Sequence, residues 1–149
     1  MAPKKDRYDL PEKQVLATLN EILELELAGV VRYMHYSFMV FGHSRIPITG
    51  WLRAQATESL AHATLAGEHI TALGGHPSLK IGPLLETHQH SVDDILAESV
   101  DHEQKGLDGY RRLLELVKDR SVMLEEYART QIGTEESHIA ETRKMMRER

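Results

Sequence analysis

Apolar residues recur every three to four positions through most of the 149-residue chain, and glycine and proline residues divide this pattern into four long segments. The spacing is that of amphipathic helices, and no stretch alternates apolar and polar residues as a strand would. The segments predict helices over about 11–41, 49–73, 91–118 and 121–147. Pro11 suits a first helical turn, and Ser91 and Ser121 suit the N-cap positions of the last two helices.

The lengths of the three connections predict how these helices are arranged. The first and third connections are short, so the helices that they join should be antiparallel neighbours, whereas the middle connection is long enough to run the length of a bundle. We therefore expect an all-α antiparallel four-helix bundle with one long crossover between helices two and three, forming a single domain over residues 1–149. Gly29 lies inside the first helix, where we expect it to allow close packing.

The composition narrows the chemistry. The chain contains no cysteine, which excludes disulfides, thiolate zinc sites, iron–sulfur clusters and a cysteine nucleophile, so any metal must be held by His, Asp or Glu. A formal net charge of -5 does not favour nucleic-acid binding. The start of the chain does not resemble a secretory signal, and the most apolar stretch, 27–41, carries Arg32 and His35 and is short for a membrane helix. These features predict a cytoplasmic protein.

Carboxylates and imidazoles interrupt the apolar face of every predicted helix. The lines read Leu19, Ile22 or Leu23, Glu26, Val30 and Tyr33; Gln55, Glu58, His62, Leu65 and His69; Leu96, Val100, Glu103, Leu107, Tyr110, Leu114 and Val117; and Leu124, Ala128, Gln131, Glu135, His138 and Thr142. A single buried Glu or His is usually a hydrogen-bonded structural residue. Four helices that each point acid or imidazole inward, with no Arg or Lys at the matching level, indicate a metal as the counter-charge.

The spacing of these residues repeats between the two halves of the chain. The interval from Glu26 to Glu58 is 32 residues, as is the interval from Glu103 to Glu135. Tyr33 and Tyr110 each follow a glutamate by seven residues. Two helices giving one Glu each and two giving Glu with a nearby His is the arrangement of di-iron and di-manganese carboxylate bundles. The donor set suits Fe or Mn, with Zn as a further candidate.

At these residues the sequence resembles the bacterioferritins, within the wider ferritin-like family, over about 19–146. The stretches that carry the resemblance are Glu26-Leu27 to Tyr33, His62-Ala63 with Leu73-Gly74-Gly75-His76-Pro77, Glu103 to Gly106, and Glu135-Glu136-Ser137-His138-Ile139. The resemblance implies a ferritin-like subunit with a dinuclear iron ferroxidase centre that oxidises Fe(II) with O2 or H2O2, in iron storage or homeostasis.

The resemblance also implies a role for each ligand. Glu26 and Glu103 would be terminal carboxylates, Glu135 would bridge the two metals, and His62 and His138 would each hold one metal. Tyr33 would lie beside the site, and the internal repeat gives Tyr110 the matching position in the second half.

The sequence departs from the family pattern in three respects. Ser59 stands where the second helix of the family has its Glu, so we expect the adjacent Glu58, about 40° from His62 around the helix, to take that role. Leu60 stands where bacterioferritins have the Met that ligates haem, so haem is not expected. The chain ends eleven residues after His138, which leaves no room for the fifth helix of a 24-subunit cage. We expect a homo-oligomer that is at least a dimer.

Other functions remain open at this point. The bundle could sequester Fe, Mn or Zn without turnover, could be a peroxide-protective mini-ferritin, or could be purely structural. His88 and His90, in the predicted crossover, are candidates for an accessory metal site, although exposed loop histidines are the commoner case. His69 is either a residue that supports the centre or a polar residue near the bundle end, and Trp51 and Phe38 are expected in the core or at a subunit contact.

Overall fold

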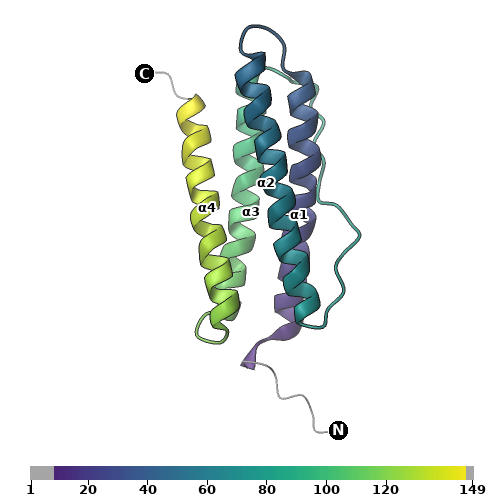
Figure 1. Ribbon diagram of the computed structural model, residues 1–149, viewed down its shortest axis with the longest axis vertical. Helices are drawn as coiled ribbons and strands as arrows, with labels where there is room; N and C mark the ends of the chain where they lie inside the picture. The colour runs from purple at the N-terminus through teal and green to yellow at the C-terminus, as the bar shows by residue number, and fades with distance from the viewer. Residues whose placement is uncertain (1–8, 147–149) are drawn as a thin grey trace.

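The computed structural model describes residues 9–146, which form an antiparallel bundle of four helices (Figure 1). The helices are α1 (Glu12–Met39), α2 (Arg45–Ala72), α3 (Val92–Val117) and α4 (Val122–Met146). The described residues contain no strand, so the predicted all-α bundle with a long connection between helices two and three is confirmed. That connection, residues 73–91, passes along the outer side of α1 (Figure 1).

One predicted helix boundary, the start of the second helix, was wrong. We expected the second helix to begin at 49, after Pro47, but α2 begins four residues earlier, at Arg45. Pro47 therefore lies in the first turn, where a backbone N–H would have no helical partner in any case. The expected N-cap roles of two serines are confirmed: Ser91 Oγ accepts from the Asp94 N–H at 3.0 Å, and Ser121 Oγ accepts from the Leu124 N–H at 3.3 Å. The expected end of the fourth helix, at 147, lies outside the described residues.

Two apolar clusters occupy the bundle interior. The larger cluster, around Leu19, Ile70 and Leu113, joins all four helices, and the smaller cluster packs Tyr36 and Leu52 against Ile95. The glutamates of the predicted centre lie between these clusters along α1 and α3. The apolar residues on either side therefore fix the height at which the acidic side chains meet.

The inward face of α2 is rotated by about one residue from the predicted line. Of that line only His62 is buried, and Leu65 is 43% exposed. The buried positions of α2 are Thr49, Leu52, Ala56, Ser59, His62, Ala63, Ala66 and Ile70. The prediction followed the large and polar residues, whereas small side chains pack inward here because α1 approaches closely.

Gly29 marks that close approach. A Cβ at Gly29 would lie 2.8 Å from Ser59 Oγ and 3.0 Å from His102 Nε2, so only glycine fits without movement of its neighbours. The expectation that Gly29 allows close packing is confirmed, and Ser59 is the side chain that occupies the space. No helix of the described chain is both long and apolar enough to cross a membrane.

Candidate metal centre

The predicted ligands converge from all four helices into two adjoining groups. Ligand atoms of Glu26, His62 and Glu135 lie within 4.8 Å of one another, as do those of Glu103, Glu135 and His138. Glu135 belongs to both groups and is 2% exposed. The arrangement has two three-residue positions that share one carboxylate.

His62 occupies the centre of the first group. Its Nδ1 lies 3.5 Å from Glu26 Oε1 and 3.4 Å from Glu135 Oε1. Burial lowers the pKa of His62, but the contacts with Glu135 and Glu26 outweigh burial and raise it to about 10. Without metal, the histidine therefore carries a proton between the two carboxylates.

Glu58 reaches both groups from α2. Its Oε1 lies 3.7 Å from His62 Nε2, and its Oε2 lies 3.0 Å from His138 Nε2. Its side chain is 36% exposed, so it approaches from the edge of the centre, whereas Ser59 is packed against Gly29. The helix thus presents a carboxylate to both histidines even though the position of the family's Glu is a serine.

Two buried tyrosines hold the two outer carboxylates. Tyr33 on α1 donates to Glu103 Oε1 on α3, and Tyr110 on α3 donates to Glu26 Oε1 on α1 at 3.0 Å. Burial is the main reason that the pKa of Glu26 and the pKa of Glu103 are both raised, and hydrogen bonding to Glu135 adds to the shift at Glu103. Burial therefore opposes the charged form of both glutamates when no metal is bound.

Within residues 9–146, no arginine or lysine balances the charge of the acidic cluster. Among the described residues, no Lys or Arg forms an ion pair with Glu26, Glu58, Glu103 or Glu135. Glu135 Oε2 is shielded from solvent and has no hydrogen-bond partner in the described chain. A buried carboxylate oxygen without a partner is costly, and a bound cation is the usual remedy. The donor set of four carboxylates and two imidazoles fits two iron ions.

The contact between Arg32 and His102 beside the centre was not predicted from the sequence, where Arg32 served only to exclude a membrane helix. Arg32 donates to the Tyr36 hydroxyl, and its Nη1 lies 3.2 Å from His102 Nδ1. Burial, together with Arg32, lowers the pKa of His102 to about 4, which leaves the imidazole neutral. The i, i+4 spacing of Arg32 and Tyr36 was the available signal.

Of the other residues that the sequence singled out, His69 lies near the centre, whereas Phe38 and Leu60 lie on the surface. The ring of His69 is 4.3 Å from that of Tyr127, which contacts Tyr110 edge to face, so His69 is connected to the centre through two aromatic rings. Phe38 is 55% exposed, so it is not a core residue, whereas Trp51 is partly buried and packs against the smaller apolar cluster. Leu60, which stands at the position expected for a haem-binding Met, is 52% exposed.

Comparison with known proteins defines the class. The ferritin-like domain model matches residues 16–149, and the chain belongs to the ferritin-like family. No curated protein matches the sequence.

Three solved structures share the fold. A ferritin-like di-iron-carboxylate protein from Bacillus anthracis str. Ames has a TM-score of 0.87 and 21% identity over 91% of this chain and 97% of its own. The Desulfovibrio desulfuricans bacterioferritin has a TM-score of 0.84 and 21% identity over 95% of this chain and 82% of its own. The dodecameric bacterioferritin-related thioferritin from Bacteroides fragilis has a TM-score of 0.81 and 20% identity over 91% and 85%.

Proposed function

We propose that the centre binds two iron ions and that the protein is a ferroxidase, which oxidises Fe(II) with O2 or H2O2 in iron storage or homeostasis. The observation that carries this proposal is the shared carboxylate of Glu135, which places two three-residue groups side by side in the bundle interior. Membership of the ferritin-like family supports the same conclusion.

Each half of the centre has its own donors. Glu26 and His62 would hold one ion, Glu103 and His138 the other, and Glu135 and Glu58 face both positions. Carboxylate oxygens neutralise the ionic charge and favour the higher oxidation state. Each Fe(II) supplies one electron, so two ions and two protons reduce O2 to H2O2, or H2O2 to two waters.

The chain's own residues manage protons and orientation. Tyr33 and Tyr110 fix the rotamers of Glu103 and Glu26 by hydrogen bonds from the opposite helix. Because ligation requires deprotonated donors, the raised pKa values of Glu26, Glu103 and His62 mean that iron binds in competition with protons at these groups.

We further propose a cytoplasmic homo-oligomer of at least two chains, with Fe(II) and O2 or H2O2 as its small partners. Exposed apolar side chains on α1 and α2, including Val31, Phe38 and Leu60, offer surface for pairing.

A non-catalytic iron, manganese or zinc binding protein is the second candidate. The observation that favours it is the 36% exposure of the Glu58 side chain, which stands one residue from the family's Glu position. Such a protein would take up two ions without oxidising them rapidly.

The test is iron retention after anaerobic Fe(II) loading, exposure to air and desalting. We expect Glu135→Ala to retain about two ions per chain fewer than its matched control, Glu136→Ala, because Glu136 is an exposed neighbour on α4 paired with Arg111. Equal retention in the two variants would exclude the proposed centre. Oxygen uptake in the same samples separates oxidation from sequestration.

A further inference from the structure

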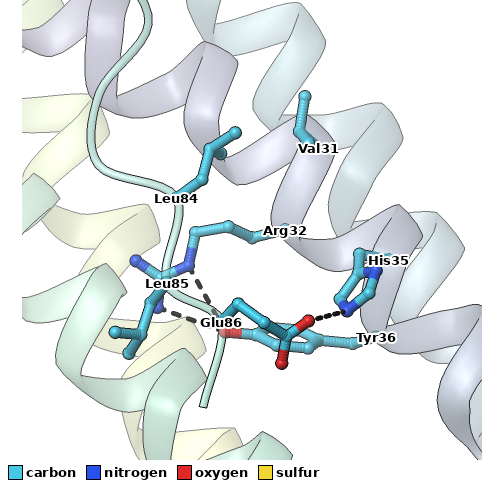
Figure 2. Close-up of a pocket in the computed structure, with 7 residues that line it drawn as sticks. All are labelled: Val31, Arg32, His35, Tyr36, Leu84, Leu85 and Glu86. Carbon is cyan, nitrogen blue, oxygen red and sulfur yellow. Dashed lines mark hydrogen bonds and ion pairs between the residues drawn. The ribbon is translucent and has the colours of Figure 1, made fainter. Parts of the chain in front are cut away.

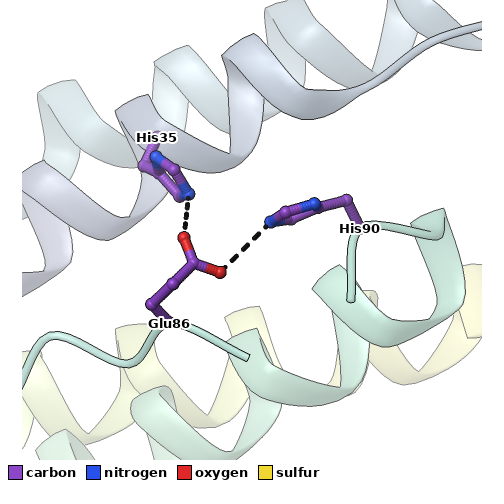
Figure 3. Close-up of side chains that lie close together, drawn as sticks. All are labelled: His35, Glu86 and His90. Atoms are coloured by element: carbon purple, nitrogen blue, oxygen red, sulfur yellow. Dashed lines mark ion pairs between the residues drawn. The ribbon is translucent and has the colours of Figure 1, made fainter. Parts of the chain in front are cut away.

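A second group of metal-ligating side chains lies on the outer side of the bundle, where the crossover passes α1. His35 on α1 faces Glu86 and His90 of the crossover (Figure 3). His35 Nε2 lies 3.0 Å from Glu86 Oε2, and His90 Nε2 lies 3.3 Å from Glu86 Oε1. We call these three residues the surface triad. His88, the other crossover histidine, is not part of this group: its side chain is 85% exposed, and its Nδ1 lies farther from Glu86 Oε1, at 3.7 Å.

One ligand atom from each residue of the surface triad lies within 4.8 Å of the others, close enough for one ion to contact all three, and the 3.0 and 3.3 Å contacts run to different oxygens of Glu86. Zinc–nitrogen and zinc–oxygen bonds of about 2.0–2.1 Å in tetrahedral geometry place neighbouring ligand atoms about 3.3 Å apart. The Nε2 atoms of His35 and His90 are both shielded from solvent, yet neither makes a well-formed hydrogen bond in the described chain. Two shielded nitrogens aimed at one carboxylate are available to a cation.

The local backbone holds this arrangement in place. The His88 N–H donates to Glu86 Oε1 at 2.6 Å, and this bond is the main reason that the pKa of Glu86 is lowered, which keeps the carboxylate charged. Between Glu86 and His90 the backbone changes direction at His88, which has a left-handed φ of 54°. Earlier in the crossover, the Gly82 N–H donates to the Glu24 carbonyl at 2.8 Å, and this hydrogen bond attaches the crossover to α1.

We propose that the surface triad binds one divalent transition-metal ion, separate from the centre inside the bundle. Two imidazoles and one carboxylate suit Zn²⁺ and Fe²⁺, and three protein ligands leave a position for water. A pocket of about 190 Å³ shares His35 and Glu86 with the surface triad and also includes Arg32 and Tyr36 (Figure 2). The pocket provides space for that water beside the ion.

Arg32 lies between this pocket and the bundle interior, so we do not expect ions to pass from one to the other. It lines the pocket, is itself 7% exposed, and contacts His102 on α3. Its fixed positive charge repels a cation moving inward. A single ion held by the surface triad would instead fasten the crossover to α1, because its ligands come from a helix and a loop that are far apart in the sequence.

The test is Zn²⁺ binding to the full chain by equilibrium dialysis and metal analysis. We expect the double variant His35→Asn/His90→Asn to bind one ion per chain fewer than the wild-type protein. His88→Asn is the matched control, because Asn tolerates the left-handed conformation, and it should bind as many ions as the wild type. Equal binding by the wild type and the double variant, or an equal loss in the control, overturns the assignment.

Hydrogen exchange of residues 83–91 gives a second readout. Zn²⁺ should slow exchange in the wild type and in His88→Asn but not in the double variant; unchanged exchange in the wild type would contradict the fastening role. Glu135→Ala removes the shared ligand of the bundle centre and should leave this protection intact. Failure of the bundle centre and failure of the surface triad are therefore distinguishable.

Discussion

Tyr110 on α3 donates a 3.0 Å hydrogen bond to Glu26 on α1. A second hydrogen bond runs in the opposite direction between the same two helices: Tyr33 on α1 donates to Glu103 on α3. Each tyrosine follows a glutamate by seven residues on its own helix and holds the glutamate of the other helix. The repeat in the sequence is thus expressed as a reciprocal pair of contacts that positions both outer carboxylates for metal.

Removing one of these hydroxyls should weaken the centre. Tyr110→Phe leaves Glu26 without its donor from α3, and we expect Fe(II) affinity to fall by about 10-fold or more, as for other groups that orient metal ligands. Anaerobic Fe(II) titration measures the effect. Tyr127→Phe is the control, because no hydrogen bond joins the Tyr127 hydroxyl to a predicted metal ligand among the described residues; an equal loss there would contradict the role of the Tyr110 bond.

Neutralising Glu103 should have opposite effects with and without iron. Burial raises the pKa of Glu103, so the fold opposes its charge, and Glu103→Gln should increase the free energy of unfolding of the metal-free protein. Iron binds the native state and raises its stability, and this gain should shrink in the variant. Thermal unfolding with and without Fe(II) tests both effects. An iron-induced rise in Tm as large as that of the wild type would count against Glu103 as a ligand.

The metal-free protein should lose stability as the pH rises above neutrality. The pKa of His62 is about 10 in the fold against an ordinary value of 6.5, so between these values the native state holds a proton that the unfolded chain has lost. The free energy of unfolding should therefore fall across this window, by at most about 1.4 kcal/mol per pH unit. Urea unfolding at pH 7, 8 and 9 measures the slope, which His62→Gln should flatten. A slope that the substitution leaves unchanged would assign the effect to other groups.

Glu58 should be needed for oxidation despite its exposure. Because it faces one histidine of each group, Glu58→Ala should slow Fe(II) oxidation about 10-fold or more, as measured by stopped-flow absorbance. Glu68→Ala, at an exposed position on the same helix, is the matched control. Wild-type rates in Glu58→Ala would leave His62 as the functional contribution of α2.

The sequence predicted the bundle and the convergence of its acids because both follow from helical periodicity. Glu26 and Glu103 occupy slots that the period assigns to the interior, and both are buried. The prediction of which face of α2 points inward was wrong, because buried Ala and Ser residues add little to the hydrophobic periodicity. Their burial depends on the close approach of α1 at Gly29. Of the surface triad, the sequence pointed only to His90, as a candidate accessory ligand together with His88. His35 and Glu86 were not predictable as its partners, since the path of an irregular crossover past His35 is set by tertiary contacts such as that between Gly82 and Glu24.

The most direct test of the centre is an anomalous difference map, at the iron absorption edge, of crystals loaded anaerobically with Fe(II). The account predicts two peaks inside the bundle, one beside Glu26 and His62 and one beside Glu103 and His138, with Glu135 between them. A bundle interior without iron, or with one peak that does not involve Glu135, would contradict it.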